Sequence, residues 1–516
     1  MSEDLKPRVR VTTAGFTRKI IPPKPPAAFR TVALYEAAGG GKRAESWSKA
    51  GNYGPVSLLG RSLDTLRNRC RFECRNNPTA SRVVDFIVGK VVGNGLRPSL
   101  RAGIEDPAFN RLVEDWMEQC DADEVSDFYG LQELVMRNTV TAGDACARFR
   151  ERDPVEDAHL AVPMQIQLVP GEMLPSIDPT GESVSGIIFK GPGRRSAYKF
   201  LKQHPGERLN GAAVEAGFSY VPAEKVAHVF WQRDIGQVRG EPWLVRGLIP
   251  LHDLDAYQDA ELVRKKMAAM PVFWIQTPVD TQRPQGPASY AEDGTPLDAE
   301  GNAWVAEDPV ELMPDLQPGA VVPVPPGYQV NPSLPADVGG QYDVFVRRQL
   351  QRVCQAVSVP YELVTGDTPS GANERMMRVR IHDFYSLVRQ WRRMLVRSFC
   401  QPAWRSFVQA AYDSGKWTPV SGYTIEDYKR VDWIGEPPAH THPEQEVNAE
   451  LLAVRGRLKS RSQVIRERGG DPEQVFRQIA DEHRLAADLG IRLEDDPDLE
   501  MTVEDDPDPP ASPATE

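Results

Sequence analysis

RCRFECRNNPTASRVVDFIVGKVVGNGLRPSL, residues 69–100, joins two stretches of helical spacing through an Asn-Asn-Pro break. Residues 57–75 are expected to form the first helix, which must end where Asn77-Pro78 interrupts the pattern. The second helix has apolar residues at helical spacing: Val83, Val84, Phe86, Ile87 and Val91. The glycine cluster GKVVGNG (89–95) then favours a turn in which the backbone packs closely.

Further elements follow on both sides of a strand-rich region. Asp106-Pro107 can cap a helix, and another helix is expected near residues 127–141. Short β-leaning segments come next, at 146–152, 164–169, 186–190, 197–200 and 225–231. Runs of helix and strand in this order predict an α+β domain of about one hundred residues.

The second half contains two helices around an unusual insertion. A helix is expected over 243–270, kinked at Pro250, and another over 342–358, ended by Pro360. Between them, residues 271–340 hold 13 prolines and 10 acidic residues but only Arg283 as a basic one, which favours a loop-rich β module. The flanking helices are expected to pack as an antiparallel pair and project the insertion outward.

A loop, TGDTPSGAN (365–373), leads to a long helix over about 374–411, with an expected kink at Pro402. Two short helices are expected to close the fold. The first has Ser460 and Gln463 as a capping pair, and the second begins at Asp471-Pro472 and stops at Gly490. Residues 1–30 are basic and proline-rich and residues 491–516 are acidic, so both are expected to be flexible.

Composition limits the class of protein. The chain has 516 residues, enough for several domains, and a net charge of −12, which lacks the overall basic character of a nucleic-acid-gripping protein. Charge is uneven, because residues 1–101 carry 19 Lys and Arg against 7 Asp and Glu, whereas residues 490–516 carry 10 acidic residues against one Arg. Such asymmetry indicates partner surfaces. Six dispersed cysteines are expected to be reduced, and neither a signal peptide nor a membrane span is expected.

Motifs for phosphate or metal binding are weak. GKVVGNG (89–95) lacks the lysine of a phosphate loop and follows a helix, so a turn is the better interpretation. Cys70 and Cys74 share one helix face without a second pair nearby, which favours packing over metal binding. His440, His442 and Glu444 lie in a proline-rich linker, where solvation is the better interpretation. No metal or other cofactor is expected.

Signs of catalysis are equally weak. The chain has no Gly-x-Ser-x-Gly nucleophile motif, and the carboxylates of 292–315 and 494–508 are charge runs in breaker-rich sequence. A two-metal nuclease would need such carboxylates to converge on rigid elements. The arginines of the long helix could bind a phosphate backbone, but ion pairs between subunits are the favoured interpretation. An enzyme is therefore not expected.

Several segments, taken in order, resemble the lambda-type portal (head–tail connector) proteins of tailed bacteriophages over residues 31–490. In the N-terminal half they are YEAA (35–38), LRNRCR (66–71), RNNPTA (75–80), VVGNGL (91–96), AGDA (142–145) and GII (186–188). In the remainder they are VPAEKVAHVF (221–230), QVRGEPWL (237–244), AELV (260–263), VPYELVTGD (359–367) and RGGDPEQV (468–475). Their shared order over some 450 residues is more specific than any single segment.

The resemblance implies a portal fold assembled as a ring. Residues 1–30 are then a basic arm, 31–242 the wing, 243–270 and 342–359 the two stem helices, and 271–341 the clip. Residues 360–372 are the tunnel loop, 374–411 the long wing helix, 412–490 the C-terminal wing or crown helices, and 491–516 an acidic tail. These ranges are what the resemblance implies about this chain.

The same resemblance suggests functional residues. Those expected in the tunnel loop, at the DNA channel, are Thr365, Gly366, Asp367, Thr368, Pro369, Ser370, Gly371 and Asn373. Those expected to dock partners at the clip are Asp293, Glu307, Asp308, Glu311 and Asp315. The basic residues expected to face a neighbouring subunit or DNA are Arg375, Arg378, Arg389, Arg392 and Arg393.

Function and partners are likewise implied by the resemblance. The ring, typically of twelve subunits, would assemble in the host bacterial cytoplasm, nucleate the capsid and stand at one vertex of the virion. Viral double-stranded DNA would pass through it without sequence specificity. The expected protein partners are the terminase large subunit, head-completion or neck proteins, and the major capsid and scaffold proteins; a membrane is not expected. The alternatives are a metal-dependent nuclease and another head–tail structural protein.

Overall fold

The computed structural model describes residues 51–100, 104–178, 180–207, 217–269, 272–276, 289–297, 302–303, 329–333, 342–367, 373–437 and 443–491. The two helices predicted around the Asn-Asn-Pro break are α1 (Pro55–Asn76) and α2 (Pro78–Val91). The Asn77 side chain accepts hydrogen bonds from the backbone N–H groups of Thr79 and Ala80 at 2.9 and 3.2 Å. The residue at which α1 ends is therefore also the N-cap of α2.

The core includes residues of α2, α3 (Pro107–Gln119), α4 (Phe128–Ala142), α9 (Gln401–Asp413) and the short α10 (Ile425–Tyr428). Asp106 caps α3 as predicted, by accepting a hydrogen bond from the Phe109 N–H at 2.9 Å. Its second oxygen accepts from Trp417 Nε1 and Tyr428 Oη, at 2.8 and 3.0 Å. One carboxylate thus joins a cap near residue 106 to aromatic residues more than 300 positions later.

Two three-stranded antiparallel sheets lie beside this helical core. In the first, β2 (Asp144–Glu151) is central between β3 (Met164–Pro170) and β7 (Val226–Phe230), and in the second β5 (Arg195–Leu201) lies between β4 (Ile187–Phe189) and β6 (Phe218–Pro222). Cys146 of β2 is opposite Val169 on one side and His228 on the other. The α+β prediction is confirmed as a mixture of helices and small sheets, although β6 was not predicted.

The helix expected over 243–270 is divided in two, which corrects the prediction of a kink at Pro250. A 3-10 turn, η6 (Trp243–Arg246), comes first, and α5 (Leu248–Ala269) begins only after Gly247. Pro250 therefore lies in the first turn of α5, where its missing N–H has no helical partner to lose. Because the proline starts a helix rather than interrupting one, no kink is required.

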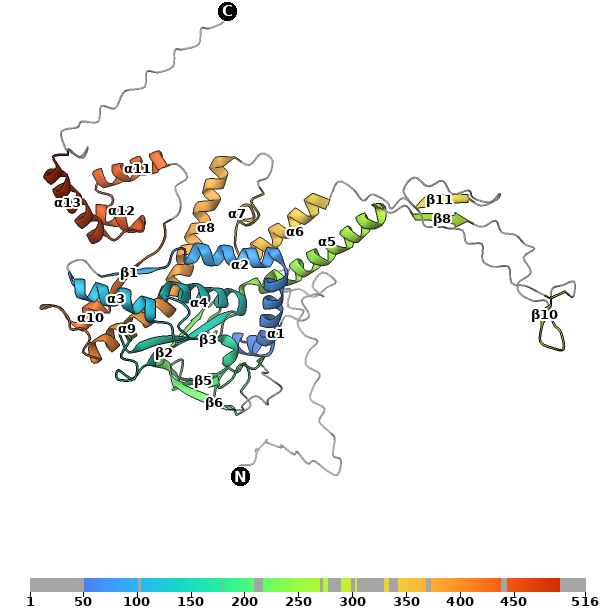
Figure 1. The fold of residues 1–516 in the computed structure, drawn as a ribbon, viewed down its shortest axis with the longest axis horizontal. Helices are drawn as coiled ribbons and strands as arrows, with labels where there is room; N and C mark the ends of the chain where they lie inside the picture. The colour runs from blue at the N-terminus through green and yellow to red at the C-terminus, as the bar shows by residue number, and fades with distance from the viewer. Residues whose placement is uncertain are drawn as a thin grey trace, which may run out of the picture.

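Helix α5 packs against α6 (Tyr342–Ala356), and the two helices lead away from the core side by side (Figure 1). Tyr257 of α5 lies 4.7 Å from Phe345 and 6.0 Å from Tyr342, measured between ring centroids. At their outer end, β8 (Val272–Gln276) pairs antiparallel with β11 (Gln329–Ser333). A small hairpin of β9 (Ser289–Tyr290) and β10 (Pro296–Leu297) lies farther out (Figure 1).

The long helix predicted over 374–411 is interrupted once. It consists of α8 (Glu374–Leu395), a π-helical turn η7 (Val396–Cys400) and α9. Pro402 lies in the first turn of α9, directly after the π turn. The missing N–H of a proline disturbs the preceding hydrogen-bond ladder, and a π turn is one way in which a helix absorbs that disturbance.

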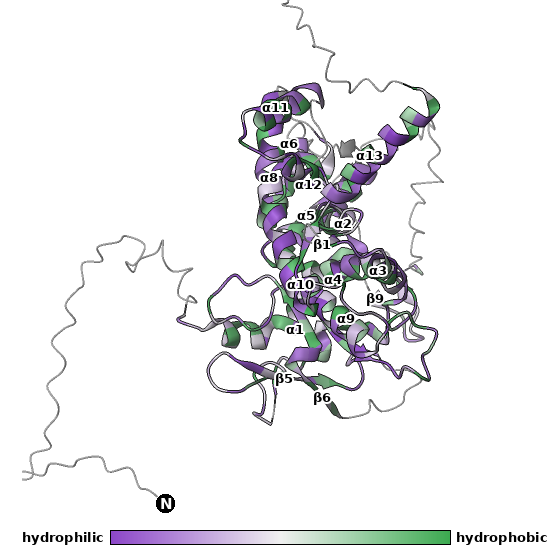
Figure 2. Cartoon of the chain, turned by 90° about the vertical axis from the view of Figure 1, so that its left-hand side faces the viewer, coloured by the Kyte–Doolittle hydropathy of each residue, from purple (hydrophilic) through white to green (hydrophobic). Residues whose placement is uncertain are grey.

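Three helices, not the two predicted, form the C-terminal part of the described chain: α11 (Pro443–Arg455), α12 (Arg461–Glu467) and α13 (Pro472–Leu489). Ser460 and Asp471 cap α12 and α13, and Gly490 ends α13 with a left-handed φ of 67°, as predicted. The three helices stand apart from the sheets in both views (Figures 1 and 2). They are joined to the core through the strand pair of β1 (Arg97–Leu100) and β12 (Val431–Ile434), neither of which was predicted.

Candidate functional site

The loop after α6 is held at its beginning by a short helix, α7 (Tyr361–Thr365). Gly366 ends α7 with a left-handed φ of 74°, and its N–H donates to the Glu362 carbonyl at 2.9 Å. Thr365 Oγ1 donates to the Tyr361 carbonyl at 2.9 Å and accepts from the Asp367 N–H at 3.2 Å. Three of the predicted loop residues therefore form an ordered root.

Asp367 ties this root to the preceding helix. Its Oδ2 accepts hydrogen bonds from Tyr361 Oη at 2.6 Å and from Arg347 Nε of α6 at 2.9 Å. Burial and the hydrogen bond to this carboxylate raise the pKa of Tyr361, so the phenol stays protonated and continues to donate. The root of the loop is therefore joined to α6 by an ion pair.

The other end of the loop is fixed at the start of α8. Asn373 is the N-cap, and its side chain accepts from the Arg375 N–H at 3.0 Å. Arg380 of α8 forms an ion pair with Glu362 of α7, whose carboxylate is almost fully buried. Both ends of the loop are therefore held by α6, α7 and α8. The predicted loop residues outside the described part are Thr368, Pro369, Ser370 and Gly371.

The arginines predicted on the long helix differ in their surroundings. Arg375, Arg389 and Arg393 are exposed on α8, whereas Arg378 is half-buried. Arg392 is also half-buried, and it donates to three backbone carbonyls, those of Lys90 at 3.0 Å, Val91 at 2.8 Å and Glu436 at 2.6 Å. Its guanidinium thus satisfies carbonyls at the C-terminal end of α2 within the same chain.

One of the five predicted clip carboxylates lies in the described part of the chain. Asp293 is exposed in the turn between β9 and β10, where its Oδ1 accepts from the Thr295 N–H at 3.1 Å. This hydrogen bond lowers the pKa of Asp293, which therefore remains ionised at neutral pH. The other four, Glu307, Asp308, Glu311 and Asp315, lie outside the described residues.

A buried charge cluster that the sequence did not predict surrounds Asp144. Its carboxylate accepts from Arg67 Nη2 at 2.5 Å and from Arg239 Nε at 2.6 Å, and it lies 3.3 Å from His228 Nε2. All four side chains are at most 1% exposed. Burial alone would raise the pKa of Asp144, but the two arginines outweigh it and hold that pKa well below its ordinary value.

This cluster explains four of the motif segments at once. Arg67 belongs to LRNRCR, Asp144 to AGDA, His228 to VPAEKVAHVF, and Arg239 to QVRGEPWL. Arg239 also donates to the carbonyls of Gly171, Leu174 and Ser185, at 2.6, 3.2 and 3.0 Å. The motifs are therefore joined in one network that links α1 to β2 and β7 of the first sheet.

Two glycines of the same motifs let the backbone close around the cluster. Gly143 has φ of 92°, and a Cβ at this position would lie 2.5 Å from the Gly240 carbonyl oxygen. A Cβ at Gly240 would lie 1.9 Å from the Gly143 carbonyl oxygen. No side chain fits at either contact, so the spacing between AGDA and QVRGEPWL depends on both glycines.

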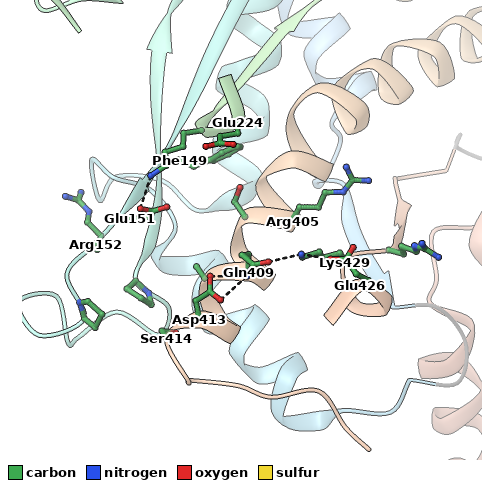
Figure 3. A pocket seen from close by; sticks show the side chains of 16 residues that line it. Phe149, Glu151, Arg152, Glu224, Arg405, Gln409, Asp413, Ser414, Glu426 and Lys429 are labelled. Atoms are coloured by element: carbon green, nitrogen blue, oxygen red, sulfur yellow. Dashed lines mark hydrogen bonds and ion pairs between the residues drawn. The ribbon is translucent and has the colours of Figure 1, made fainter. Parts of the chain in front are cut away.

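A polar cavity of about 790 Å³ opens between the end of β2, α9 and α10 (Figure 3). Four of the nine charged residues in its lining form ion pairs: Lys225 with Glu151 at 2.9 Å and Lys429 with Glu426 at 2.7 Å. Gln409 joins Lys429 to Asp413 through further hydrogen bonds. The cavity is therefore a polar surface hollow in which only part of the charged lining is paired.

The other candidate motifs have structural surroundings. Gly93 and Gly95 have φ of 59° and 98° after the end of α2, so the turn interpretation of GKVVGNG is confirmed. Cys70 is buried and Cys74 half-buried on α1. Within the described residues no group of His, Cys, Asp and Glu could hold a metal ion; His440 and His442 lie outside them. None of the described helices is long and apolar enough to cross a membrane.

Comparisons with known proteins give the family that the motif segments resemble. The family model described as "Phage portal protein, lambda family" matches residues 40–392. A "Probable portal protein" of Halomonas phage phiHAP-1 is 20% identical over 465 residues, which cover 86% of this chain and 85% of that protein.

Two solved structures are also similar to this chain, both at 12% identity. A chain of "Neck of empty GTA particle computed with C6 symmetry" has a TM-score of 0.46, with 82% of this chain and 95% of that chain covered. A chain of "Virion of native gene transfer agent (GTA) particle" has a TM-score of 0.42, with 80% and 94% covered.

Proposed function

Because this chain belongs to the lambda family of phage portal proteins, we propose that it forms the ring at one capsid vertex through which viral DNA is packaged and ejected. The observation that carries the proposal is the family match over residues 40–392, more than half of the chain. The relative from phage phiHAP-1 supports it over most of both proteins. In this proposal the protein acts as a structural conduit and catalyses no reaction.

The arrangement of α5 and α6 supports the assignment of a stem and a clip. Two helices that pack side by side and carry the insertion at their outer end suit a stem formed by 243–270 and 342–359, with a clip formed by 271–341 (Figure 1). Residues 31–242 then form the wing, 374–411 the long wing helix and 412–490 the C-terminal wing or crown helices. The basic arm (1–30) and the acidic tail (491–516) flank them.

Uncovered apolar side chains on the stem favour contacts between subunits. Ile249, Leu262 and Val263 of α5 and Val344 of α6 are each more than half exposed in the single chain. In a head-to-tail ring, every subunit donates one surface and accepts another, so such side chains become buried between neighbours. Twelve subunits are proposed, and Arg375, Arg378, Arg389 and Arg393 are proposed to face a neighbour or DNA.

The fixed root and N-cap support a tunnel loop between α7 and α8. Asp367 and Asn373 hold the two ends, so residues 368–372 are proposed to narrow the channel at a defined height. Deleting residues 368–372 should impair DNA packaging or retention while the protein still assembles. Loss of assembly instead would show that this loop serves the fold.

The acidic insertion supports a docking and channel role for the clip. Its excess of carboxylates, including Asp293, Glu307, Asp308, Glu311 and Asp315, would repel the DNA backbone and attract basic partner surfaces. The proposed partners are the terminase large subunit, then head-completion or neck proteins, with capsid and scaffold proteins during assembly in the host cytoplasm. Neutralising these residues should weaken docking or make DNA adhere; unchanged packaging and neck attachment would remove the idea.

The experiment that tests the proposal is electron microscopy of the purified protein, with native mass spectrometry to count subunits. A closed ring with a central channel near the width of duplex DNA is expected. Persistence of monomers at all protein and salt concentrations would overturn the ring. The same sample is incubated with DNA and Mg²⁺, because metal-dependent cleavage would favour a nuclease instead.

A further inference from the structure

A groove of about 550 Å³ lies between the first turns of α13 and the surface formed by β1 and α3. Two contacts bridge its walls: Ser99 Oγ donates to Asp471 Oδ2 at 2.9 Å, and Arg477 Nη2 pairs with Glu105 Oε1 at 2.8 Å. Figure 1 shows α13 opposite β1 and α3, at the end of the molecule away from the β8–β11 pair. The groove is therefore formed by segments that are about 370 residues apart in the sequence.

The floor of the groove is apolar. It is formed by Leu100, Val113, Met117, Tyr129 and Trp404, of which Leu100, Val113 and Tyr129 are only half-buried. Helix α13 offers little cover, because Pro472 and Ala486 are its buried residues, while Phe476 and Ile479 remain at least 40% exposed. An incomplete apolar floor favours burial under a further segment of chain.

The rim of the groove is acidic. The lining includes two basic residues, Arg97 and Arg477, against six acidic ones, which are Glu105, Asp106, Glu114, Asp471, Glu473 and Asp481. Asp106 and Asp471 serve as helix caps, and Glu105 is paired with Arg477. Glu114 is exposed and makes no hydrogen bond or ion pair in the described part of the chain, and Asp481 pairs only with exposed Arg484. Among the described residues, the net charge of the lining, six negative against two positive, is −4.

We propose that this groove binds the basic N-terminal arm of the protein, residues 1–30. The arm has seven Lys and Arg residues against two acidic ones, a net charge of +5 that complements the groove. Its apolar residues Phe16, Ile20 and Ile21 lie among the basic ones and match an apolar floor with an acidic rim. An arm of this composition can supply both the apolar cover and the positive charges that the groove lacks.

Charge favours the arm over other occupants of the groove, and the length of the preceding chain allows the arm to reach it. The acidic tail, residues 491–516, starts directly after α13 but is repelled by the groove, as is a DNA backbone. The 50 residues that precede Gly51 can span up to about 165 Å when extended, so the arm can reach the groove of its own chain or that of a neighbour. The proposal does not depend on the ring, since binding within one chain is also possible.

The test places a photo-crosslinking amino acid at Gln478, an exposed residue of the groove wall, in the full-length protein. Mass spectrometry of the products should find crosslinks to residues 1–30. The mass of the product, one chain or two, tells whether the arm comes from the same chain. Crosslinks only to other segments, or none to the arm, would overturn the proposal.

A charge-reversal pair tests the acidic rim. Glu114→Lys with Asp481→Lys changes the net charge of the lining from −4 to 0, and should lower the crosslink yield about tenfold or more. Glu118→Lys is the matched control, because Glu118 lies on the same helix, is exposed and does not line the groove. Equal loss of crosslinking in the control would overturn the role of the rim.

Limited tryptic cleavage in the arm, after Arg8, Arg10 and Arg18, gives a second readout on the full-length protein. It should become faster in the double variant and stay unchanged in Glu118→Lys. Circular dichroism verifies that both variants remain folded, as expected for substitutions at exposed positions. Arm cleavage at one rate in all three proteins would count against the groove as the site where the arm binds.

Discussion

Replacing Asp144 by asparagine removes a negative charge from between two buried guanidinium groups. In the native protein, Asp144 Oδ1 lies 2.5 Å from Arg67 Nη2, and Oδ2 lies 2.6 Å from Arg239 Nε. An asparagine fills the same space but has a single acceptor oxygen, so its NH₂ group must face one of the two arginines. The substitution therefore tests charge pairing without creating a cavity.

The expected cost follows from the burial of the cluster. Removing one partner of a buried ion pair typically costs about 3–5 kcal/mol, because the remaining charge is left uncompensated. Two arginines lose their partner here, and both are at most 1% exposed, so we expect about 4 kcal/mol. This corresponds to an increase of about a thousandfold in the local unfolding equilibrium constant.

Amide hydrogen exchange along β2 and β7 is the appropriate assay, because a protein of several parts does not unfold in a single step. It is carried out near neutral pH, where Asp144 is ionised in both the folded and the unfolded protein. Glu151→Gln is the matched control on the same strand. It removes a surface ion pair to Lys225 and should cost at most about 1 kcal/mol.

Two outcomes would refute this reasoning. The first is an exchange pattern in Asp144→Asn that matches the Glu151→Gln control. The second concerns Arg67→Met added to Asp144→Asn: this removes one unpaired buried cation and should recover part of the lost protection. Arg67 is chosen because it donates to a single backbone carbonyl, that of Ala142 at 2.8 Å, whereas Arg239 donates to three. If the double variant is less protected than Asp144→Asn alone, the loss of Asp144 does not act through an unpaired charge.

Burial lowers the pKa of His228 to about 4 from its ordinary 6.5, so the unfolded chain binds a proton first and stability falls as pH drops from 6.5 towards 4. The total loss of folding stability over this pH range is about 3 kcal/mol. His228→Gln should flatten this part of the pH–stability curve, measured by hydrogen exchange or fluorescence. An unchanged slope would exclude His228 as its source. Gly240→Ala should destabilise the contact between AGDA and QVRGEPWL by at least about 2 kcal/mol and reduce soluble yield, because its Cβ would collide with the Gly143 carbonyl. Wild-type yield and thermal stability would contradict the close approach of the two backbones. Arg392→Met should lower folding stability by about 1–3 kcal/mol, because it leaves three backbone carbonyls without a donor. The neighbouring Arg393 is exposed, so Arg393→Met should change stability by less than about 0.5 kcal/mol. Equal effects of the two substitutions on thermal stability would argue against a capping role for Arg392.

The helix boundaries that the sequence predicted well are those with local caps. Asn77, Asp106 and Asp471 each accept hydrogen bonds from N–H groups two or three residues later, so the signal lies within one turn of chain. The prediction of a kink at Pro250 failed for an equally local reason. Pro250 was assigned to a helix interior, but Gly247 delays the start of α5, and the order of a few residues decided between an initiating and a kinking proline.

The portal family was also accessible from the sequence, because it depends on the order of motifs and not on their contacts. The purpose of those motifs was not accessible. Nothing in AGDA or QVRGEPWL indicates that Asp144 and Arg239, 95 residues apart, meet in one ion pair. Likewise β1 and β12 pair across more than 330 positions, and each strand, at four residues, is too short to be recognised alone.

The sequence by itself determined where most helices begin and end, which segments are charged, and the family to which the chain belongs. Only the tertiary structure decided which charges are buried and paired, that Arg392 satisfies the end of another helix, and that α13 forms one wall of an acidic groove. The physical reason is that caps and periodicity act over a few residues, whereas the environment of a charge is set by whichever distant segments pack around it. Asp144, with two arginines and a histidine from three other segments, is the clearest case.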